Sequence, residues 1–344
     1  MVLALALLVL LAISVLYNVG SFAAGLFGGR SAYYGRVAGP RLDEVTKEDH
    51  GSANKIAVIP VNGIIMGGLM DPGAFSMVEV IRAQLRRAEH DDGVKAVILR
   101  VDSPGGEVMA ADEIHNAIRD FQNKTPKPVI ASMGSLAASG GYYVSAPCRW
   151  IIANELTLTG SIGVIMSTWN YRGLMDKVGV VPLTFKSGRY KDMLSGSREP
   201  DQITPEERDM VQALVLQTYS RFTNIVQQGR SRAYQKGKES GAEGRPLISG
   251  WPEYADGRVL SGTDAFKYGF VDQLGTFEDA VERTKKMVRI SSANLIEYQQ
   301  RYEFADFLHL FGKSDTKAVK IDLGLERPKL KAGQLYFLSS SFVQ

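Results

Sequence analysis

This sequence contains little cysteine and histidine and has no large excess of charge of either sign. The 344 residues include one cysteine and four histidines, and 40 Lys and Arg residues stand against 37 Asp and Glu residues, a net charge of +3. One cysteine excludes an intramolecular disulfide framework, and four scattered histidines leave little for a zinc site. The near balance of charge does not favour binding to nucleic acid. We therefore expect a globular protein that uses no metal and no other cofactor.

Charged residues are also absent from the first 29 positions, which are rich in Leu, Val and Ala. A helix rises ~1.5 Å per residue, so this run is long enough to cross a hydrocarbon core of ~30 Å, and we predict an N-terminal membrane anchor at 1–29. A cleaved signal peptide is an alternative, because Ala23 and Ala24 are small, and a buried core helix is another. The basic residues that follow the run are Arg30, Arg36 and Arg41. No basic residue precedes it, so the positive-inside rule does not favour an outward-facing catalytic part.

Apolar runs rich in Val and Ile alternate with helical patterns over residues 55–290, the range that we expect to form the main domain. The spacing predicts an α/β fold with at least partly parallel strands. A linker is expected at 30–54, which is rich in Gly, Ser and Arg, and a partly ordered tail at 291–344. Buried strands are predicted at 55–61, 95–102, 128–133 and 180–185, and helices at 75–89, at 107–121 and from Thr204 onward.

A turn with two glycines follows the second predicted strand, in the string Ser103-Pro104-Gly105-Gly106. Glycines let bare backbone N–H groups approach a ligand, and the helix that follows adds partial positive charge. Such a turn can hold a carbonyl oxygen or an oxyanion. A plain strand-to-helix turn is the alternative.

A candidate nucleophile, Ser139, lies among small residues after the third predicted strand, where Gly140 and Gly141 follow it. A helix N-cap is the simpler interpretation. A nucleophilic serine needs a base, and none of the four histidines is clearly placed to act, so a Ser-His-Asp triad is disfavoured. Lysine is the other base that serine hydrolases use, although an ordinary lysine with a pKa of ~10.4 is almost wholly charged at pH 7. Spacing alone does not choose between Lys186 and Lys191.

A third string, Thr159-Gly160-Ser161-Ile162-Gly163, places hydroxyl groups beside glycines. Ser161 could donate to or accept from a neutral lysine and so orient it. A strand end that contains glycine is the alternative interpretation.

These strings occur in the order Ser-Pro-Gly-Gly, Ala-Ala-Ser-Gly-Gly-Tyr-Tyr, Thr-Gly-Ser-Ile-Gly-Val and Ser-Gly-x-x-Lys-Asp. In this order they resemble the signal peptide peptidase A family of Ser-Lys peptidases in its short, single-repeat form. The resemblance implies that Ser139 is the nucleophile, that Lys191 is the general base and that Ser161 orients the lysine. It also implies an oxyanion hole at Gly106 and Gly140.

The resemblance further implies a fold similar to Clp protease and the crotonases, a spiral of ββα units. It implies a homo-oligomer with an enclosed chamber, an anchor in a bacterial cell membrane with the catalytic domain outside the cytoplasm, and peptide substrates, chiefly cleaved signal peptides. The dyad could form within one chain or between neighbouring chains.

Two other functions remain open at this point. A crotonase-type acyl-CoA enzyme would use the same fold and bring a glutamate into the site, for which Glu107 is the candidate. A non-catalytic membrane scaffold could also have this fold, although the presence of both Ser139 and Lys191 argues against it.

Overall fold

The computed structural model describes residues 39–68, 75–241, 244–300 and 336–338. The predicted anchor at 1–29 lies outside these residues. The strands are β1 (Leu42–Glu48), β2 (Lys55–Asn62), β3 (Val94–Ser103), β4 (Gly105–Glu107), β5 (Val129–Ala138), β6 (Trp150–Ala153), β7 (Leu158–Gly160), β8 (Val259–Ser261), β9 (Gln273–Leu274), β10 (Asn294–Gln300) and β11 (Tyr336–Leu338). The helices are α2 (Met77–His90), α3 (Val108–Lys124), α4 (Gly140–Ser145), α5 (Arg172–Lys177), α6 (Pro205–Glu239), α7 (Gly262–Lys267) and α8 (Phe277–Val288), with 3₁₀ turns at Pro200–Gln202 and Trp251–Tyr254.

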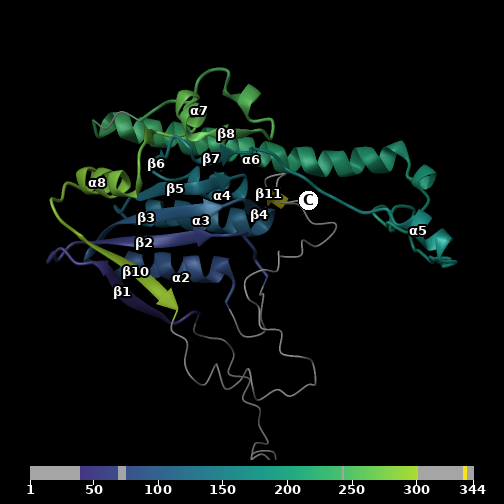
Figure 1. The fold of residues 1–344 in the computed structure, drawn as a ribbon, viewed down its shortest axis with the longest axis horizontal. Helices are drawn as coiled ribbons and strands as arrows, with labels where there is room; N and C mark the ends of the chain where they lie inside the picture. Colours follow the sequence, from purple (N-terminus) through teal and green to yellow (C-terminus); the bar gives the residue numbers. More distant parts are fainter. Residues whose placement is uncertain (1–38, 69–74, 242–243, 301–335, 339–344) are drawn as a thin grey trace, which may run out of the picture. The chain divides into compact units, whose positions relative to one another are not determined.

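The main sheet has the strand order β1-β10-β2-β3-β5-β6-β9, with β7 and β8 attached beside β5 (Figure 1). Strands β10, β2, β3, β5, β6 and β9 pair in parallel, and β1 is antiparallel to β10. Parallel strands need crossover connections, which α2 and α3 supply between successive strands. The expected α/β class with parallel pairing is therefore present.

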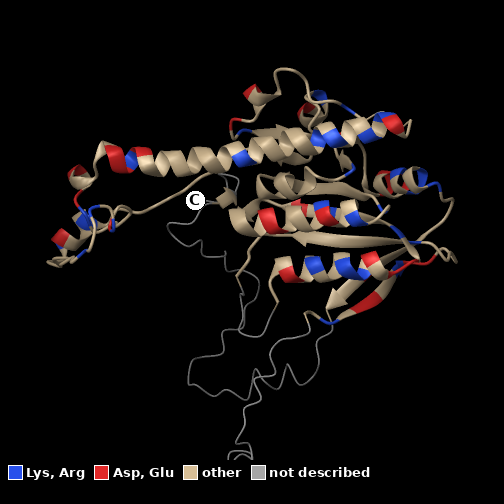
Figure 2. Cartoon of the chain, turned by 180° about the vertical axis from the view of Figure 1, so that it is seen from behind, with Lys and Arg blue, Asp and Glu red and all other residues tan. Residues whose placement is uncertain are grey.

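Helices cover both faces of this sheet. The larger core lies on the face covered by α2, α3, α4 and α6, and a smaller one packs α8 against the other face. Burial on both faces is why the central strands read as almost unbroken apolar runs: in β3, Val97, Ile98 and Leu99 are all fully buried. Figure 2 shows that the charged residues of α2 and α3 lie on their outer faces.

Capping boxes set the starts of two helices. The Ser76 hydroxyl accepts from the Glu79 backbone N–H at the start of α2, and the Glu79 carboxylate accepts in return from Ser76. Thr204 and Glu207 form the same reciprocal pair at the start of α6, where Pro205 occupies the first turn. Such pairs satisfy backbone donors that a helix leaves free at its first turn. The predicted helix start at Thr204 is confirmed.

Two strands of the sheet lie outside the range 55–290. β1 falls within 30–54 and β10 within 291–344, and the two pair with each other from Leu42↔Gln300 to Glu48↔Leu295. The sheet therefore draws on segments about 250 residues apart, and most residues of β1, the strand at its edge, are exposed.

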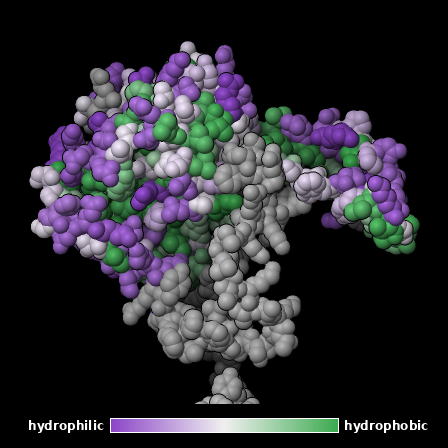
Figure 3. Space-filling view, in the orientation of Figure 1, coloured by the Kyte–Doolittle hydropathy of each residue, from purple (hydrophilic) through white to green (hydrophobic). Residues whose placement is uncertain are grey.

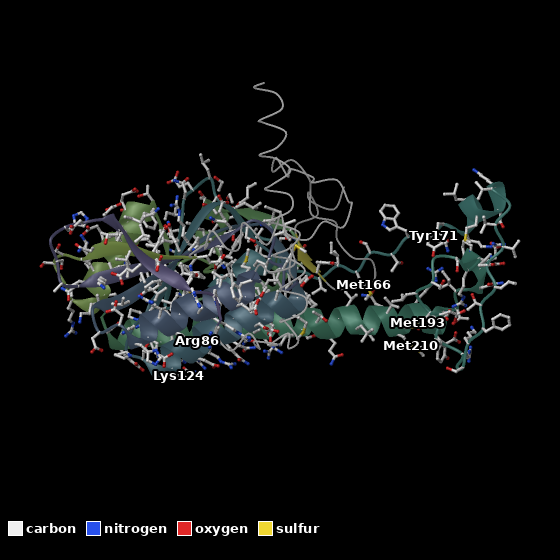
Figure 4. The ribbon with its side chains drawn as sticks, turned by 90° about the horizontal axis from the view of Figure 1, so that it is seen from below. Arg86, Lys124, Met166, Tyr171, Met193 and Met210 are labelled. Carbon is white, nitrogen blue, oxygen red and sulfur yellow. The ribbon has the colours of Figure 1, made fainter. Side chains whose placement is uncertain are left out.

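A segment that we call the arm (residues 166–220) runs out from the end of β7 and returns along the first half of α6 (Figures 1 and 4). Its outgoing and returning parts are joined near their middle, where the Tyr171 N–H donates to the Gly196 carbonyl at 2.8 Å and Arg172 pairs with Glu199 at 2.7 Å. Figure 4 places Tyr171, Met193 and Met210 along this arm, away from the sheet.

The prediction of a buried strand at 180–185 is wrong. These residues form no strand, and Val181, Leu183 and Phe185 are 71, 81 and 95% exposed. A short apolar run predicts burial but does not specify the partner, and the described residues leave this run exposed. Figure 3 shows the resulting hydrophobic patch at the end of the arm.

Within the described part of the chain, no helix combines the length and the apolar character that crossing a bilayer requires.

Candidate active site

Ser139 lies at the junction between β5 and α4, in a backbone conformation that non-glycine residues rarely adopt. Its φ is 53° and its ψ is −115°. Strain of this kind costs about 1–3 kcal/mol and persists only where the surroundings enforce it. Here the Ser139 N–H donates to the Gly160 carbonyl at 2.8 Å, and its carbonyl accepts from the Tyr143 N–H at 2.8 Å. The side chain is fully buried, and its Oγ has no hydrogen-bond partner among the described residues. Ser139 thus has a backbone that is held by two hydrogen bonds and a hydroxyl group that makes none with the described residues.

Backbone donors lie next to this hydroxyl, at β4 and the first turn of α4. In β4 the Gly105 carbonyl and the Glu107 N–H both bond to Ile65, at 2.8 Å each. Because a strand's backbone groups alternate in direction, the N–H of Gly106 faces the other side, toward Gly140. A Cβ on Gly140 would lie 3.1 Å from the Gly106 nitrogen. The glycines expected to form an oxyanion hole are therefore close together.

Glycine is required at two positions of this turn. Gly105 has a φ of +100°, which L-residues rarely adopt, and a Cβ there would overlap the backbone of Phe337. A Cβ on Gly106 would overlap the backbone of Ile65. The close approach of three backbone segments therefore depends on the absence of these two side chains.

Ser161 lies beside Ser139 because β7 pairs with β5 in the register Ala138↔Gly160. The two serines are the next residues of these paired strands, and both have positive φ, 48° for Ser161. The Ser161 N–H donates to the Arg258 carbonyl at 2.7 Å. Ser139, Ser161, Gly106 and Gly140 are thus brought together at the same end of the parallel strands.

Lys191, by contrast, is not brought to Ser139 within this chain. It is exposed on the arm, and its ammonium makes no hydrogen bond or ion pair with any described residue. Lys186, the other candidate, donates to the Arg189 carbonyl at 3.1 Å and pairs with Asp192 at 2.8 Å. This contact lowers the pKa of the Asp192 carboxyl. Because Asp192 is engaged by Lys186, and lies 3.6 Å from Arg198, it does not hold the ammonium of Lys191.

A strand from the C-terminal part of the sequence, β11, lies across the site. Its residues pair antiparallel with β4 in the register Tyr336↔Glu107, Phe337↔Gly106 and Leu338↔Gly105. On its other side Tyr336 exchanges backbone hydrogen bonds with Ile165, at 3.2 and 3.3 Å. An extended segment of the chain is therefore held between two strand edges next to Ser139, which is the β-augmentation by which many proteins hold peptides.

A polar cluster behind α4 was not found from the sequence. The Tyr143 hydroxyl donates to Asp112 at 2.5 Å, and Arg221 donates to the same carboxylate at 3.0 Å. Although burial opposes it, these two hydrogen bonds lower the pKa of Asp112, while burial raises the pKa of Tyr143. Burial also lowers the pKa of His115 to about 4, so this ring is neutral near pH 7. The cluster joins α3, α4 and α6 behind the nucleophile; its one sequence signal was the Tyr-Tyr pair after Gly141.

No group of three or more His, Cys, Asp or Glu side chains in the described ranges is arranged to hold a metal ion. Glu107, the candidate for a crotonase-type site, accepts from the Gly67 N–H at 2.8 Å.

Comparison with known proteins identifies the family. The model of peptidase family S49 matches residues 121–291, and that of Clp protease matches residues 63–152. A putative signal peptide peptidase SppA of Enterococcus faecium is 37% identical over 278 residues, which cover 80% of this chain and 74% of that protein. The chain belongs to peptidase family S49. It is accordingly a serine peptidase, and the crotonase and scaffold interpretations are set aside.

Other S49 peptidases differ from this chain in length. Protease 4 of Haemophilus influenzae is 35% identical over 241 residues, 70% of this chain but 36% of that protein, so this chain spans about a third of it. Among solved structures, ClpP1 of Listeria monocytogenes is similar with a TM-score of 0.37 and 14% identity, over 67% of this chain and 95% of that one.

Proposed function

We propose that this S49 peptidase cleaves peptide bonds with Ser139 as nucleophile and Lys191 of a neighbouring copy of the chain as general base. The observation that carries the proposal is the buried, unpartnered hydroxyl of Ser139 beside the Gly106 and Gly140 backbone. The exposed position of Lys191 supports a base supplied by a second copy. The ion pair of Lys186 with Asp192 makes Lys186 the poorer candidate.

The reaction follows from these positions. The neutral amine of Lys191, oriented by the Ser161 hydroxyl, takes the proton of Ser139, whose Oγ attacks the substrate carbonyl. The N–H groups of Gly106 and Gly140 stabilise the oxyanion that forms. Lys191 then gives its proton to the departing amine, and water hydrolyses the acyl-enzyme by the same route.

The arm supports assembly into a homo-oligomer. Its exposed apolar side chains, such as Leu183 and Phe185, form a patch of the kind that marks protein–protein contact. Closed symmetric rings are a common arrangement when one face of a chain binds a different face of the next. A ring in which each arm reaches the next copy would place Lys191 beside the neighbour's Ser139.

Substrate and location follow from the family and from residues 1–29. We infer that the apolar N-terminal segment anchors the protein in a bacterial cell membrane, with the catalytic domain outside the cytoplasm. The substrates are short hydrophobic peptides, chiefly cleaved signal peptides. A peptide in extended form would occupy the position of β11, between β4 and Ile165, and present its carbonyl to Ser139.

Mixing two inactive variants tests the dyad. Ser139→Ala and Lys191→Ala should each lower peptide cleavage by about 10³-fold or more, while Lys186→Ala retains most activity. Assembled together in equal amounts, the two inactive variants should regain about a quarter of the activity, because random placement in a ring pairs an intact serine with an intact lysine at that frequency. Full activity of Lys191→Ala would refute the assignment. Failure of the mixture to regain activity would refute a dyad between copies.

A further inference from the structure

The backbone of Ser161 is held by an extension of the ribbon that β7 forms with β8. The two strands pair antiparallel as far as Gly160↔Val259. One residue beyond that pair, the Ser161 N–H donates to the Arg258 carbonyl at 2.7 Å. Ser161 has a φ of 48°, a conformation that costs free energy in a non-glycine residue and persists only where the surroundings enforce it. The Arg258 carbonyl is therefore one of the contacts that fix Ser161.

The Arg258 carbonyl belongs to a short loop, residues 255–258, whose turn is closed by one carboxylate. Asp256 Oδ1 accepts from the Arg258 backbone N–H at 3.1 Å and from Arg258 Nε at 2.8 Å, and Asp256 Oδ2 accepts from Arg258 Nη2 at 2.6 Å. Between the two residues, Gly257 has a φ of +92°. The hydrogen bonds from the Arg258 side chain lower the pKa of Asp256 to about 2, so this carboxylate is charged near pH 7.

Aromatic side chains hold both ends of the 255–258 loop. At its start, the Tyr219 hydroxyl donates from α6 to the Ala255 carbonyl at 2.6 Å. At its end, the Arg258 guanidinium lies over the ring of Tyr254, 5.5 Å from the centroid. Tyr254 stacks in turn on Tyr268, with centroids 3.7 Å apart. The loop is therefore fixed both to the helix that carries the arm and to the segment after α7.

The loop also touches the chain just beyond Ser161. A Cβ on Gly163 would lie 3.1 Å from the Gly257 Cα, so the two backbones pass in close contact. The side chains of Asp256 and Arg258 are each 49% exposed, and an ion pair with this exposure contributes little to the free energy of unfolding. The consequence of the pair is therefore geometric: it sets the place of the carbonyl that binds Ser161.

We propose that Asp256 and Arg258 are positioning residues of this peptidase, which hold Ser161 in place for the reaction. In the proposed function, on which this inference rests, the Ser161 hydroxyl orients the amine of Lys191. Tyr219 supports the same loop from α6. A misplacement of ~1 Å in the groups that orient a reacting atom can lower the rate by about 100-fold. Loss of the loop geometry should therefore lower turnover and leave peptide binding nearly as it is.

The first test removes the carboxylate that closes the loop. In full-length protein with a hydrophobic peptide, Asp256→Ala should lower kcat by about 10-fold or more with KM little changed, because it removes all three hydrogen bonds to Arg258. Tyr219→Phe, which removes one hydroxyl, should lower kcat less. Asp256→Glu, which keeps a carboxylate, should retain more of kcat than Asp256→Ala. Glu113→Ala is the matched control: it breaks an ion pair with Arg82 of similar exposure, 42 and 46%, on α3 and α2, and kcat should not change.

A second substitution at Ser161 distinguishes positioning from a general loosening of the fold. If the loop acts through Ser161, Asp256→Ala should lower kcat much less in a Ser161→Ala background than in the wild type, because the group that it positions is already gone. Gly257→Ala makes the same test through the backbone. Gly51→Ala is its control, since both glycines have positive φ and open space for a Cβ, but Gly51 lies in the turn between β1 and β2. Thermal melting shows that each variant folds.

The outcomes separate the two proposals. Cleavage that is absent from the wild type, or that survives Ser139→Ala, refutes the proposed function. Cleavage that falls with Ser161→Ala but not with Asp256→Ala or Gly257→Ala refutes the inference alone. An equal fold loss from Asp256→Ala with and without the Ser161 hydroxyl gives the loop a role in stability only and likewise overturns the inference. An unchanged kcat in Ser161→Ala overturns both the inference and the orienting role of Ser161.

Discussion

Ser139 and Lys191 lie in regions that differ in almost every physical respect. Ser139 is buried where β5, β7 and α4 meet, and backbone hydrogen bonds hold it in a rare conformation. Lys191 is exposed on the arm, where ion pairs such as Arg198 with Glu207 join polar side chains and the apolar ones face outward. The sequence of α6 has no charged residue between Asp209 and Arg221, and Figure 2 shows this stretch of the helix in tan. The core is packed within one chain, whereas the arm exposes large apolar side chains such as Leu183 and Phe185.

The largest effect on peptide cleavage is expected from substitutions that prevent the arm from packing against a second copy of the chain. Leu183→Asp combined with Phe185→Asp places two charges in the exposed apolar patch. We expect the assembly to dissociate and cleavage to fall to the level of Ser139→Ala, with the melting temperature of the core little changed, because neither residue packs on it. Light scattering and peptide cleavage measure the two effects.

Leu156→Asp is the control for this change, since Leu156 is 86% exposed but lies outside the arm. It should retain both assembly and activity. If the variant with Leu183→Asp and Phe185→Asp still assembles and cleaves peptides, the exposed apolar patch of the arm is not needed for assembly, and the proposed difference between arm and core is wrong.

The next largest effect is expected on the free energy of unfolding, from the buried ion pair that joins α6 to the core. Arg230 and Asp272 are paired with essentially no exposure, and the Asp272 carboxylate also accepts from the Ile151 N–H at 2.8 Å. Asp272→Asn leaves the Arg230 charge without a counter-ion, which costs about 3–5 kcal/mol of the free energy of unfolding. Urea unfolding measures the loss.

The same experiment on the arm sharpens the comparison. Arg172→Gln breaks the ion pairs with Asp176 and Glu199, whose carboxylates are 48 and 42% exposed, and pairs with such solvated partners contribute little to the free energy of unfolding. A loss from Asp272→Asn no greater than that from Arg172→Gln would contradict the division into a tightly held core and a loosely held arm.

Lowering the pH should lower the free energy of unfolding, because His115 is neutral in the folded chain. Its pKa is about 4 in the folded chain and ~6.5 when unfolded, so between these values the unfolded chain binds more protons and the free energy of unfolding falls as the pH falls. The loss from this residue reaches about 3 kcal/mol below pH 4 and is absent above pH 7. In His115→Leu, urea unfolding at pH 7 and pH 4 should differ by less than in the wild type. His50→Leu, at an exposed position, is the control. If the free energy of unfolding of His115→Leu changes between pH 7 and pH 4 as much as that of the wild type, the expectation is wrong.

The sequence motifs predicted the core better than the edges of the sheet. Central strands such as β3 are buried on both faces, so their composition alone indicates them, and glycines beside Ser139 mark the close approach of backbone segments. β1 and β10 pair across the length of the chain and are rich in polar residues, a composition that a local window does not distinguish from a linker. The strand β11 has three residues, too few for any periodicity.

The position of Lys191 shows a different limit. Its motif placed it in the site only through a family resemblance, and a local motif does not say whether the lysine lies near the serine of its own chain. The run at 180–185 was predicted as a buried strand because it is apolar, but a short apolar run does not show whether another segment packs on it. The contact of three aromatic rings was missed because Tyr143, Phe222 and Phe337 lie on three segments that are distant in the sequence.

The continuity of α6 has a mechanical consequence. Phe222 is the point at which α6 becomes buried in the core. The distance along the helix from Phe222 to Pro205, its first residue, is about 25 Å at ~1.5 Å per residue. A tilt of only ~5° about the buried end would move the other end by about 2 Å. Reacting groups misplaced by ~1 Å already lose much of their rate. In the assembly that we propose, the rigidity of α6 would therefore limit how accurately the amine of Lys191 is placed beside the hydroxyl of a neighbouring copy.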